Sequence, residues 1–229
     1  LNLLTMRKSI LCVILGCFFS ILCHGQVSFG VNASITSSTL SENFAKSKTG
    51  IQIGVLCNYE LNEDLTLLSG LGYVVKGVNG LWSDLNYSQQ LKMFDVQLSY
   101  LELPLSLGYK IPIGNNIRLI PNVGIFVSYG LHGHSEIKSI NFEAEEVFRF
   151  ADNSWNPFKD EKFNDWAQTT VTAFERWDYG VRSGLNIEAG NIICHGAYDL
   201  GFNKVWNGYG KMGNALKSRS LIIGIGYKF

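Results

Sequence analysis

The last ten residues, Ser220–Phe229, read SLIIGIGYKF and alternate between two kinds of side chain. Large apolar side chains stand at every second position, and small or polar residues fill most of the positions between them; the apolar set is Leu221, Ile223, Ile225, Tyr227 and Phe229. Successive side chains of a β-strand point to opposite faces, so this stretch predicts a strand that is apolar on one face only. An apolar outer face that ends in aromatic residues is typical of strands in bacterial outer-membrane β-barrels.

The first 25 residues predict an export signal. Arg7 and Lys8 precede an apolar run from Ile10 to Leu22, and the small residue Gly25 follows shortly after it. The run is about 13 residues long, which is less than the roughly 20 that a membrane-spanning helix needs. We therefore expect residues 1–25 to be a secretory signal peptide cleaved after Gly25, with residues 1–5 as an upstream extension.

The remaining chain, residues 26–229, is expected to form one domain of nearly neutral charge. The full chain has 19 basic and 19 acidic residues, and the signal removes two basic ones, which leaves 17 against 19. No basic surface for nucleic acid is predicted. Cys57 and Cys194 remain after cleavage, both on apolar faces of strands that are not neighbours, so we expect no disulfide. A lipoprotein anchored through Cys17 is the alternative interpretation of the leader.

Eight segments of the exported chain alternate with a period of two. They are residues 27–36, 50–61, 65–76, 96–110, 117–130, 177–189, 192–203 and 221–229. The connections after the second, fourth and sixth segments are short, whereas the others are long: 37–49, 77–95, 131–176 and 204–219. Short periplasmic turns and long outer loops are typical of outer-membrane barrels. The sequence thus predicts an all-β fold, an eight-stranded antiparallel up-and-down transmembrane β-barrel of OmpA/OmpX-like size with one long outer loop, located in the outer membrane of a Gram-negative bacterium.

The interior of an eight-stranded barrel is only wide enough to be filled by side chains. The inward positions carry many charged residues, which are Glu60, Lys76, Glu102, Lys110, Arg118, Asp178, Arg182, Glu188, Asp199 and Lys228, together with His195. Segments 96–110, 117–130 and 177–189 are consecutive strands. We therefore expect Glu102, Arg118, Asp178 and Arg182 to form one buried ion-pair network that plugs the lumen. A path for protons or ions through this network is the alternative.

Three stretches resemble the PorT-like outer-membrane β-barrel family of Bacteroidota, in the same chain order and at similar separations. They are YLELPLSLGY at 100–109, WDYGVRSGLNIEAGN at 177–191 and IGIGYKF at 223–229. The resemblance implies a barrel in the outer membrane, with Phe229 as a signal to the barrel-assembly machinery. The namesake of the family takes part in protein secretion and most members have no assigned activity, so the resemblance implies no secretion role for this chain.

The third outer loop, residues 131–176, is the expected carrier of any specific function. It is too long for a simple connection and has nine acidic against four basic residues between Leu131 and Glu175. Its aromatic side chains suit a protein or glycan partner, with Trp155, Phe158 and Trp166 as candidate contacts. The favoured alternative is that the aromatics form the loop's own small core over the barrel mouth. Short helices are expected at 142–150 and 164–174.

The stretch LHGHSE, residues 131–136, contains the side chains that a lipid-modifying hydrolase would use. Nucleophile, base and acid usually meet from separate segments, whereas His134, Ser135 and Glu136 are adjacent here. His132 and His134 also form an H-x-H pair, but two ligands do not complete a metal site. We expect a non-enzymatic barrel without catalytic residues, metal or cofactor, acting as a structural element, a surface-interaction module or an accessory of an envelope complex, in contact with outer-membrane lipids. The alternatives are a small envelope enzyme acting on lipid A and a secreted lipocalin-like barrel with its apolar faces inward.

Overall fold

The structure is a computed structural model, and it describes residues 27–41, 45–84, 90–114, 116–141, 147–159, 161–162, 170–171, 174–205 and 217–229. This described part consists of strands, turns and loops. A search of its residues found no helix with the length and apolar character needed to cross a membrane. The predicted signal peptide and its cleavage site lie outside the described residues.

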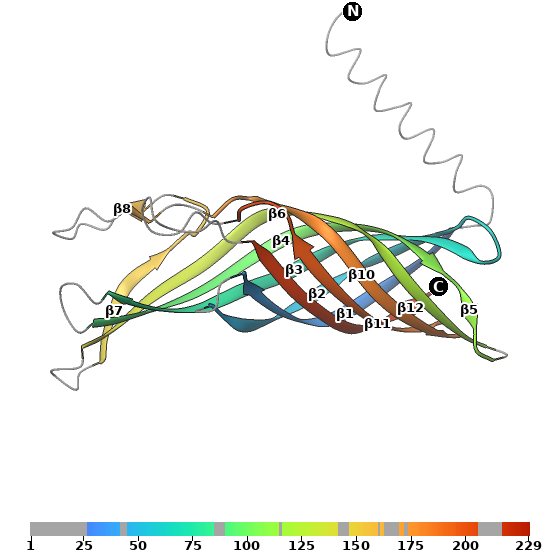
Figure 1. Cartoon of the computed structure of the whole chain (residues 1–229), viewed down its shortest axis with the longest axis horizontal. Coiled ribbons are helices and arrows are strands. Elements are labelled where there is room, and N and C mark those ends of the chain that lie inside the picture. The colour runs from blue at the N-terminus through green and yellow to red at the C-terminus, as the bar shows by residue number, and fades with distance from the viewer. Residues whose placement is uncertain are drawn as a thin grey trace, which may run out of the picture.

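Eight long strands close into an antiparallel barrel (Figure 1). They are β1 (Val27–Leu40), β2 (Ala45–Glu60), β3 (Leu65–Asp84), β4 (Gln90–Tyr109), β6 (Ile117–Asn141), β10 (Trp177–Ala189), β11 (Ile192–Gly201) and β12 (Ser218–Lys228). Each pairs with its neighbour in the chain, and β12 pairs with β1 to close the ring. The shorter strands are β5 (Ile111–Pro112), β7 (Val147–Trp155), β8 (Glu161–Lys162) and β9 (Thr170–Val171). The predicted all-β, eight-stranded barrel is confirmed.

The outer face of the barrel is apolar and exposed. Side chains in the middle of the strands, such as Ile53, Val123 and Ile225, are 54%, 63% and 64% exposed, whereas the inward positions on the same strands are mostly buried and polar. This pattern is the reverse of a water-soluble barrel, in which the apolar face is the interior. The lipocalin-like alternative is therefore wrong, and the outer face is suited to lipid.

Aromatic side chains border the apolar face at both ends. Tyr129 and Trp177 contact each other at one end with ring centroids 4.9 Å apart, and Tyr227 and Phe229 do so at the other end at 5.8 Å. Along β10, Trp177 and Ile187 are ten residues apart, which is roughly 33 Å along a strand. At the usual tilt of about 40° this spans about 25 Å, the height of the apolar band of outer-membrane barrels.

Tight turns connect the strands at the end of the barrel where Phe229 lies. The turn between β10 and β11 has only two residues, Gly190 and Asn191, and Gly190 has φ of 60°. Two-residue hairpin turns of this kind need positive φ, which glycine adopts without steric cost. Between β2 and β3, the Asn62 side chain accepts hydrogen bonds from the backbone N–H groups of Asp64 and Leu65. The predicted short connections are thus tight turns stabilised by their own residues.

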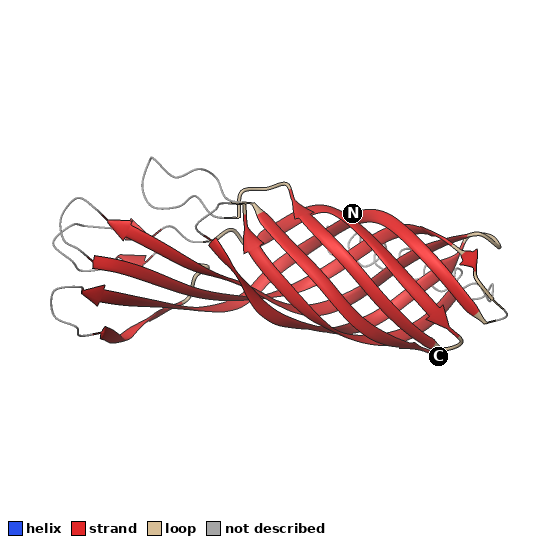
Figure 2. Ribbon diagram, turned by 60° about the horizontal axis from the view of Figure 1, so that its bottom comes forward, coloured by secondary structure: helices blue, strands red, loops and turns tan. Residues whose placement is uncertain are grey.

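At the opposite end, β3, β4 and β6 continue well past the barrel rim (Figure 2). The ladder between β6 and β10 stops at Tyr129 and Trp177, but β3, β4 and β6 stay paired with one another as far as Asp84, Gln90 and Asn141. β7 then pairs with the outer part of β6. We call this four-stranded structure the outer sheet.

The outer sheet corrects the predicted outer loops. Much of 77–95 and of 131–176 is strand rather than loop, and the helix expected at 142–150 is wrong because Val147–Trp155 is β7. The helix expected at 164–174 falls mainly outside the described residues, and its Thr170–Val171 is a strand. Strands outside the lipid no longer need an apolar outer face, so the period-two signal fades although the backbone ladder continues.

Pro104 interrupts the ladder between β3 and β4 without a bulge. The pairs Ser69↔Leu105 and Gly72↔Glu102 have the same register, but the two positions between them are unpaired. Proline has no N–H for the ladder, and the Ser69 hydroxyl donates a hydrogen bond to the Pro104 carbonyl at 3.0 Å. The register shift lies farther out, where Leu131 is the extra residue of β6.

Candidate functional site

The outer part of the lumen contains five charged side chains from four strands, which we call the ion-pair belt. They are Lys76 of β3, Glu102 of β4, Asp178 and Arg182 of β10, and Asp199 of β11. All five occupy inward positions of their strands, and their exposed fractions lie between 0% and 8%. A belt of this kind can persist only if every charge has a partner, because an unpaired buried charge is very costly.

Glu102 and Arg182 are the centre of the belt. The two carboxylate oxygens of Glu102 contact different cations, Lys76 Nζ at 2.9 Å and Arg182 Nη2 at 2.6 Å. The Arg182 guanidinium also donates to both oxygens of Asp199, at 2.6 and 2.7 Å. This bidentate arrangement is the strongest geometry for an arginine–carboxylate pair.

Neutral groups complete the belt. The Ser218 hydroxyl lies 2.8 Å from both oxygens of Asp178, and Lys76 Nζ lies 3.5 Å from that carboxylate. The Phe126 ring is fully buried below the two cations, with its centroid 4.8 Å from Lys76 Nζ and 5.9 Å from Arg182 Cζ. Aromatic faces attract cations at such distances. The lumen is therefore closed at this level by charged and aromatic side chains.

Three of the four residues predicted for the network lie in the belt, and Arg118 does not. Glu102 is opposite Ser128 of β6, ten residues from Arg118, which is roughly 33 Å along the strand. Arg118 lies instead at the end with the tight turns, opposite Glu188. An inward position was therefore not sufficient to predict an ion pair, because the height of a residue along the barrel also decides which charges meet.

Lys76 and Asp199 take the place of Arg118, and the sequence contained a signal for Asp199. The two-residue turn at Gly190 and Asn191 sets the register between β10 and β11: the residue numbers of each opposed pair add up to 381. This register places Arg182 directly opposite Asp199. Lys76 is less predictable, because it is opposite Leu98 and reaches Glu102 diagonally. Its long side chain makes that contact, and the backbone register alone does not.

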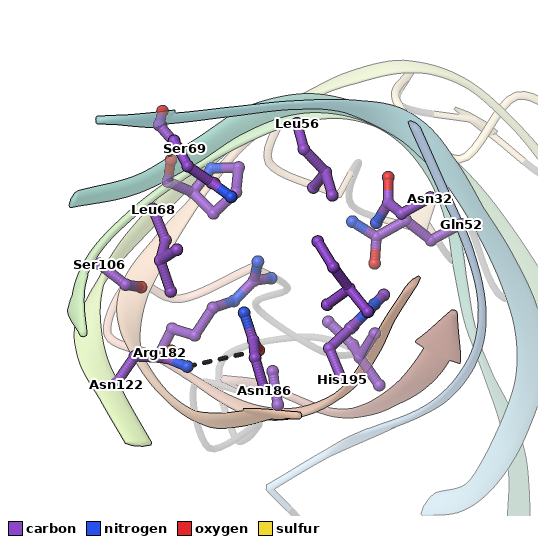
Figure 3. Close-up of a pocket in the computed structure, with 15 residues that line it drawn as sticks. Asn32, Gln52, Leu56, Leu68, Ser69, Ser106, Asn122, Arg182, Asn186 and His195 are labelled. Atoms are coloured by element: carbon purple, nitrogen blue, oxygen red, sulfur yellow. Dashed lines mark hydrogen bonds between the residues drawn. The ribbon is translucent and has the colours of Figure 1, made fainter. Parts of the chain in front are cut away.

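A cavity of about 90 Å³ lies next to the belt, and we call it the chamber (Figure 3). Its lining is rich in amides and includes Arg182 and His195, whose Nε2 lies 2.9 Å from the Ser34 hydroxyl. The Gln52 Oε1 and Ser106 Oγ atoms are buried and have no hydrogen-bond partner in the described part of the chain. Buried polar groups of this kind normally bind ordered water. The volume and the lining suit a few water molecules.

An apolar cluster closes the lumen on the outer side of the belt, and we call it the cap. It consists of Leu40, Val78, Val96, Leu98, Tyr100, Phe158, Phe174 and Val205. Strands contribute five of these residues, and Phe158, Phe174 and Val205 come from the connections. Chain segments far apart in sequence thus meet over the barrel mouth.

Phe158 is the central residue of the cap. Its ring packs edge-on to Tyr100 at 5.9 Å and lies directly against Gly130, where a side chain would leave no room. The Arg176 guanidinium covers the ring at 5.0 Å and donates a hydrogen bond to the Gly130 carbonyl at 2.8 Å. The Asn156 side chain accepts the backbone N–H of Phe158 and so fixes this turn.

The cap contains one of the loop aromatics predicted to contact a partner. Phe158 is only 7% exposed and packs within the cap, as the self-packing alternative expects, and its role as a contact for a partner stays a prediction. Trp155 is the last residue of β7, where the structure describes only the backbone. Trp166 lies outside the described residues.

The LHGHSE stretch belongs to β6 and is not a loop. Adjacent residues of a strand point to opposite faces, and accordingly His134 is exposed whereas Ser135 is completely buried. His132 stacks on Tyr73 with ring centroids 6.3 Å apart. The described residues contain no group of three or more potential metal ligands. Cys57 and Cys194 are free thiols.

Solved structures of small outer-membrane barrels are similar to this chain. Neisserial surface protein A is 15% identical with a TM-score of 0.45, and the match covers 89% of this chain and 99% of that one. Ail of Yersinia pestis, in complex with the heparin analogue sucrose octasulfate, is 13% identical with a TM-score of 0.41 and the same coverage. The outer membrane protease OmpT of Escherichia coli is 15% identical with a TM-score of 0.39, covering 89% and 95%.

The comparison with curated proteins found no significant match. The comparison with family models matched residues 22–207, most of the chain, to the outer membrane protein beta-barrel domain. The closed barrel, its apolar outer face and its aromatic borders agree with that match. The chain belongs to the outer membrane protein beta-barrel domain family.

Proposed function

We propose that this protein is a non-enzymatic outer-membrane barrel that acts through its outer side, as a surface-interaction module or an accessory of an envelope complex. The observation that carries the proposal is the combination of a closed lumen with the outer sheet. The belt and the cap fill the mouth of the barrel, while β3, β4, β6 and β7 extend beyond the rim. A barrel whose lumen is filled by side chains at this level and which presents a sheet outside is suited to binding.

The partner that we propose is a protein or a glycan bound at residues 131–176. The acidic character of this segment and its aromatic residues support that class of partner. Within it, Lys159 is exposed beside the cap, and its N–H closes the turn that begins at Asn156.

We also propose PorT-like membership within the broader family, export by the signal peptide at residues 1–25, and insertion by the barrel-assembly machinery through Phe229. The three sequence motifs support PorT-like membership, and the basic and apolar pattern of the leader supports export. Phe229 is 75% exposed at the end of the apolar face, and its N–H bonds to the Phe29 carbonyl, which is consistent with insertion by the barrel-assembly machinery. No residue of the chain points to a role in secretion.

The lipid A enzyme remains the alternative to test. Against it, His134 and Ser135 lie on opposite faces of β6, so they are not placed as a base and its nucleophile. Deleting the gene should leave the lipid A pattern unchanged in mass spectrometry. A changed pattern that the variant with both His134→Ala and Ser135→Ala also produces would overturn the non-enzymatic proposal.

Site-specific cross-linking tests the partner. A photoreactive residue in place of Lys159 should capture an envelope protein or glycan in intact cells, whereas the same residue in place of Glu63, on a tight turn at the other end, should not. Replacing residues 131–176 by a two-residue Asn-Gly turn should abolish capture by a probe placed on the outer part of β4, at Gln97. The ladder between β6 and β10 ends at Tyr129 and Trp177, so this change keeps the ladders of the barrel up to these residues, while β4 loses its β6 partners beyond Tyr100. Equal capture at both ends would refute an outer-side partner.

A further inference from the structure

A second cavity, of about 310 Å³, opens at the end of the lumen that carries the tight turns, and we call it the vestibule. Its walls come from Gly114, Asn116 and Gly190 of the turns and from the ends of β5, β6, β10 and β12. Arg118, Glu188 and Lys228 are the charged side chains among its described lining residues. In outer-membrane barrels this end faces the periplasm.

One cation of the vestibule, Arg118, is exposed and has no carboxylate partner among the described residues. Five charged inward positions lie at this end of the lumen: Glu60, Lys110, Arg118, Glu188 and Lys228. Lys228 pairs with Glu188 at 3.0 Å, and Lys110 pairs with Glu60 at 3.6 Å. These pairs use both carboxylates, and no described carboxylate lies within ion-pair distance of Arg118.

The strand register explains why Arg118 stays unpaired. Its neighbours across the ladders are Glu188 on β10 and Pro112 on β5. Glu188 is bound by Lys228 from β12, and Pro112 has no carboxylate to accept from the guanidinium. The exposed Glu63 and Asp64 of the neighbouring turn do not line the cavity.

We propose that the vestibule binds a small monovalent carboxylate through Arg118. The guanidinium presents a planar pair of donors that matches a carboxylate, and the surplus of one positive charge matches one negative charge. A phosphate dianion would leave the vestibule with a surplus negative charge. Lys228 borders the same cavity and would be a second donor if Glu188 did not occupy it. The ligand class is a periplasmic solute or peptide that carries a free carboxylate.

The test uses the full barrel folded in lipid nanodiscs with ¹⁵N-labelled arginine side chains. Sodium acetate is titrated at constant ionic strength, and the Nε–Hε signal of Arg118 is assigned by its disappearance in Arg118→Gln. Acetate should shift this signal in a saturable manner, and the signal of Arg219, which is exposed near the outer end of β12, should stay unchanged. A non-saturable shift, or an equal shift of both signals, would overturn the proposal.

Two variants separate binding from general effects of charge. Glu188→Gln frees Lys228 and should tighten acetate binding several-fold, a gain that loss of structure would not produce. Arg118→Lys keeps the charge but loses the planar donor pair, and should weaken binding about tenfold. Phosphate at equal ionic strength should compete less well than acetate. Unchanged affinity in Glu188→Gln, or preference for phosphate, would contradict the carboxylate assignment.

Discussion

Arg182 balances charge among the buried ionic groups of the lumen. It contacts both Glu102 and Asp199, and Lys76 is the other cation of the belt. The belt thus has two cations and three carboxylates, so loss of a cation is more serious than loss of a carboxylate. At the residue scale, the balance of cations and carboxylates in the belt determines whether the barrel tolerates the loss of one of them.

Replacing Arg182 by Gln should lower the free energy of unfolding by about 3–5 kcal/mol, because it leaves three buried carboxylates with one lysine. Glu102→Gln should cost less, since two cations then face two carboxylates. Urea unfolding in lipid vesicles, followed by tryptophan fluorescence, measures both. Arg118→Gln is the matched control and should change stability by less than about 0.5 kcal/mol. Equal losses in Arg182→Gln and Arg118→Gln would mean that the belt does not stabilise the fold.

Gly190 is constrained by its backbone and not by its surroundings. Its φ is 60°, and nothing lies within 4 Å of the position where a Cβ would stand. Gly190→Ala should therefore destabilise the barrel by about 1–2 kcal/mol through backbone strain alone. Gly114→Ala is the control, since Gly114 is equally open but has no positive φ. The same urea titration measures both, and indistinguishable midpoints would exclude strain at the turn.

At the element scale, the strands and the cap differ in how well they could be predicted. Inward and outward sides followed directly from the period of two, and the tight turns from glycine and asparagine. The outer ends of β3, β4 and β6 did not follow, because strands outside lipid need no apolar face. The cap depends on contacts between Phe158, Phe174 and Val205, which belong to different connections, and a local pattern does not contain such contacts.

The cap should open as a unit when its central ring is removed. Phe158→Ala removes the contacts with Tyr100, Gly130 and Arg176, so the hydrogen bonds of this region should break more often. Hydrogen exchange measured by mass spectrometry should accelerate at the N–H groups of Gly130 and Phe174, which bond to Arg176 and Pro157. Lys159→Ala removes an exposed neighbour and should leave exchange unchanged. Faster exchange throughout the barrel strands would instead indicate global destabilisation.

At the scale of the whole molecule, the solvent determines which face of each strand is outside. Val123 is 63% exposed, midway along the outer face of β6 between Ile117 and Tyr129. In water, a charged residue would be tolerated at so exposed a site. In a bilayer, Val123→Arg should cost about 2–4 kcal/mol because the guanidinium lies near the midplane.

The measurement is the unfolding free energy in lipid vesicles, with Glu175→Arg as the control. Glu175 is exposed beyond the rim, where water is available, and its substitution should change stability by less than about 0.5 kcal/mol. If Val123→Arg were as harmless as Glu175→Arg, the apolar face would not be in contact with lipid.

The sequence by itself predicted the number of barrel strands, the inward and outward faces of those strands and the outer-membrane location. These features could be predicted because alternation and turn residues are signals that need only a few neighbouring positions. Only the tertiary structure decided which inward charges meet. Lys76 and Asp199 join the predicted Glu102, Asp178 and Arg182 because strand register places them at one height, whereas Arg118 is roughly 33 Å away along β6. Contacts between distant strands depend on barrel closure and on the reach of long side chains, and a one-dimensional pattern records neither.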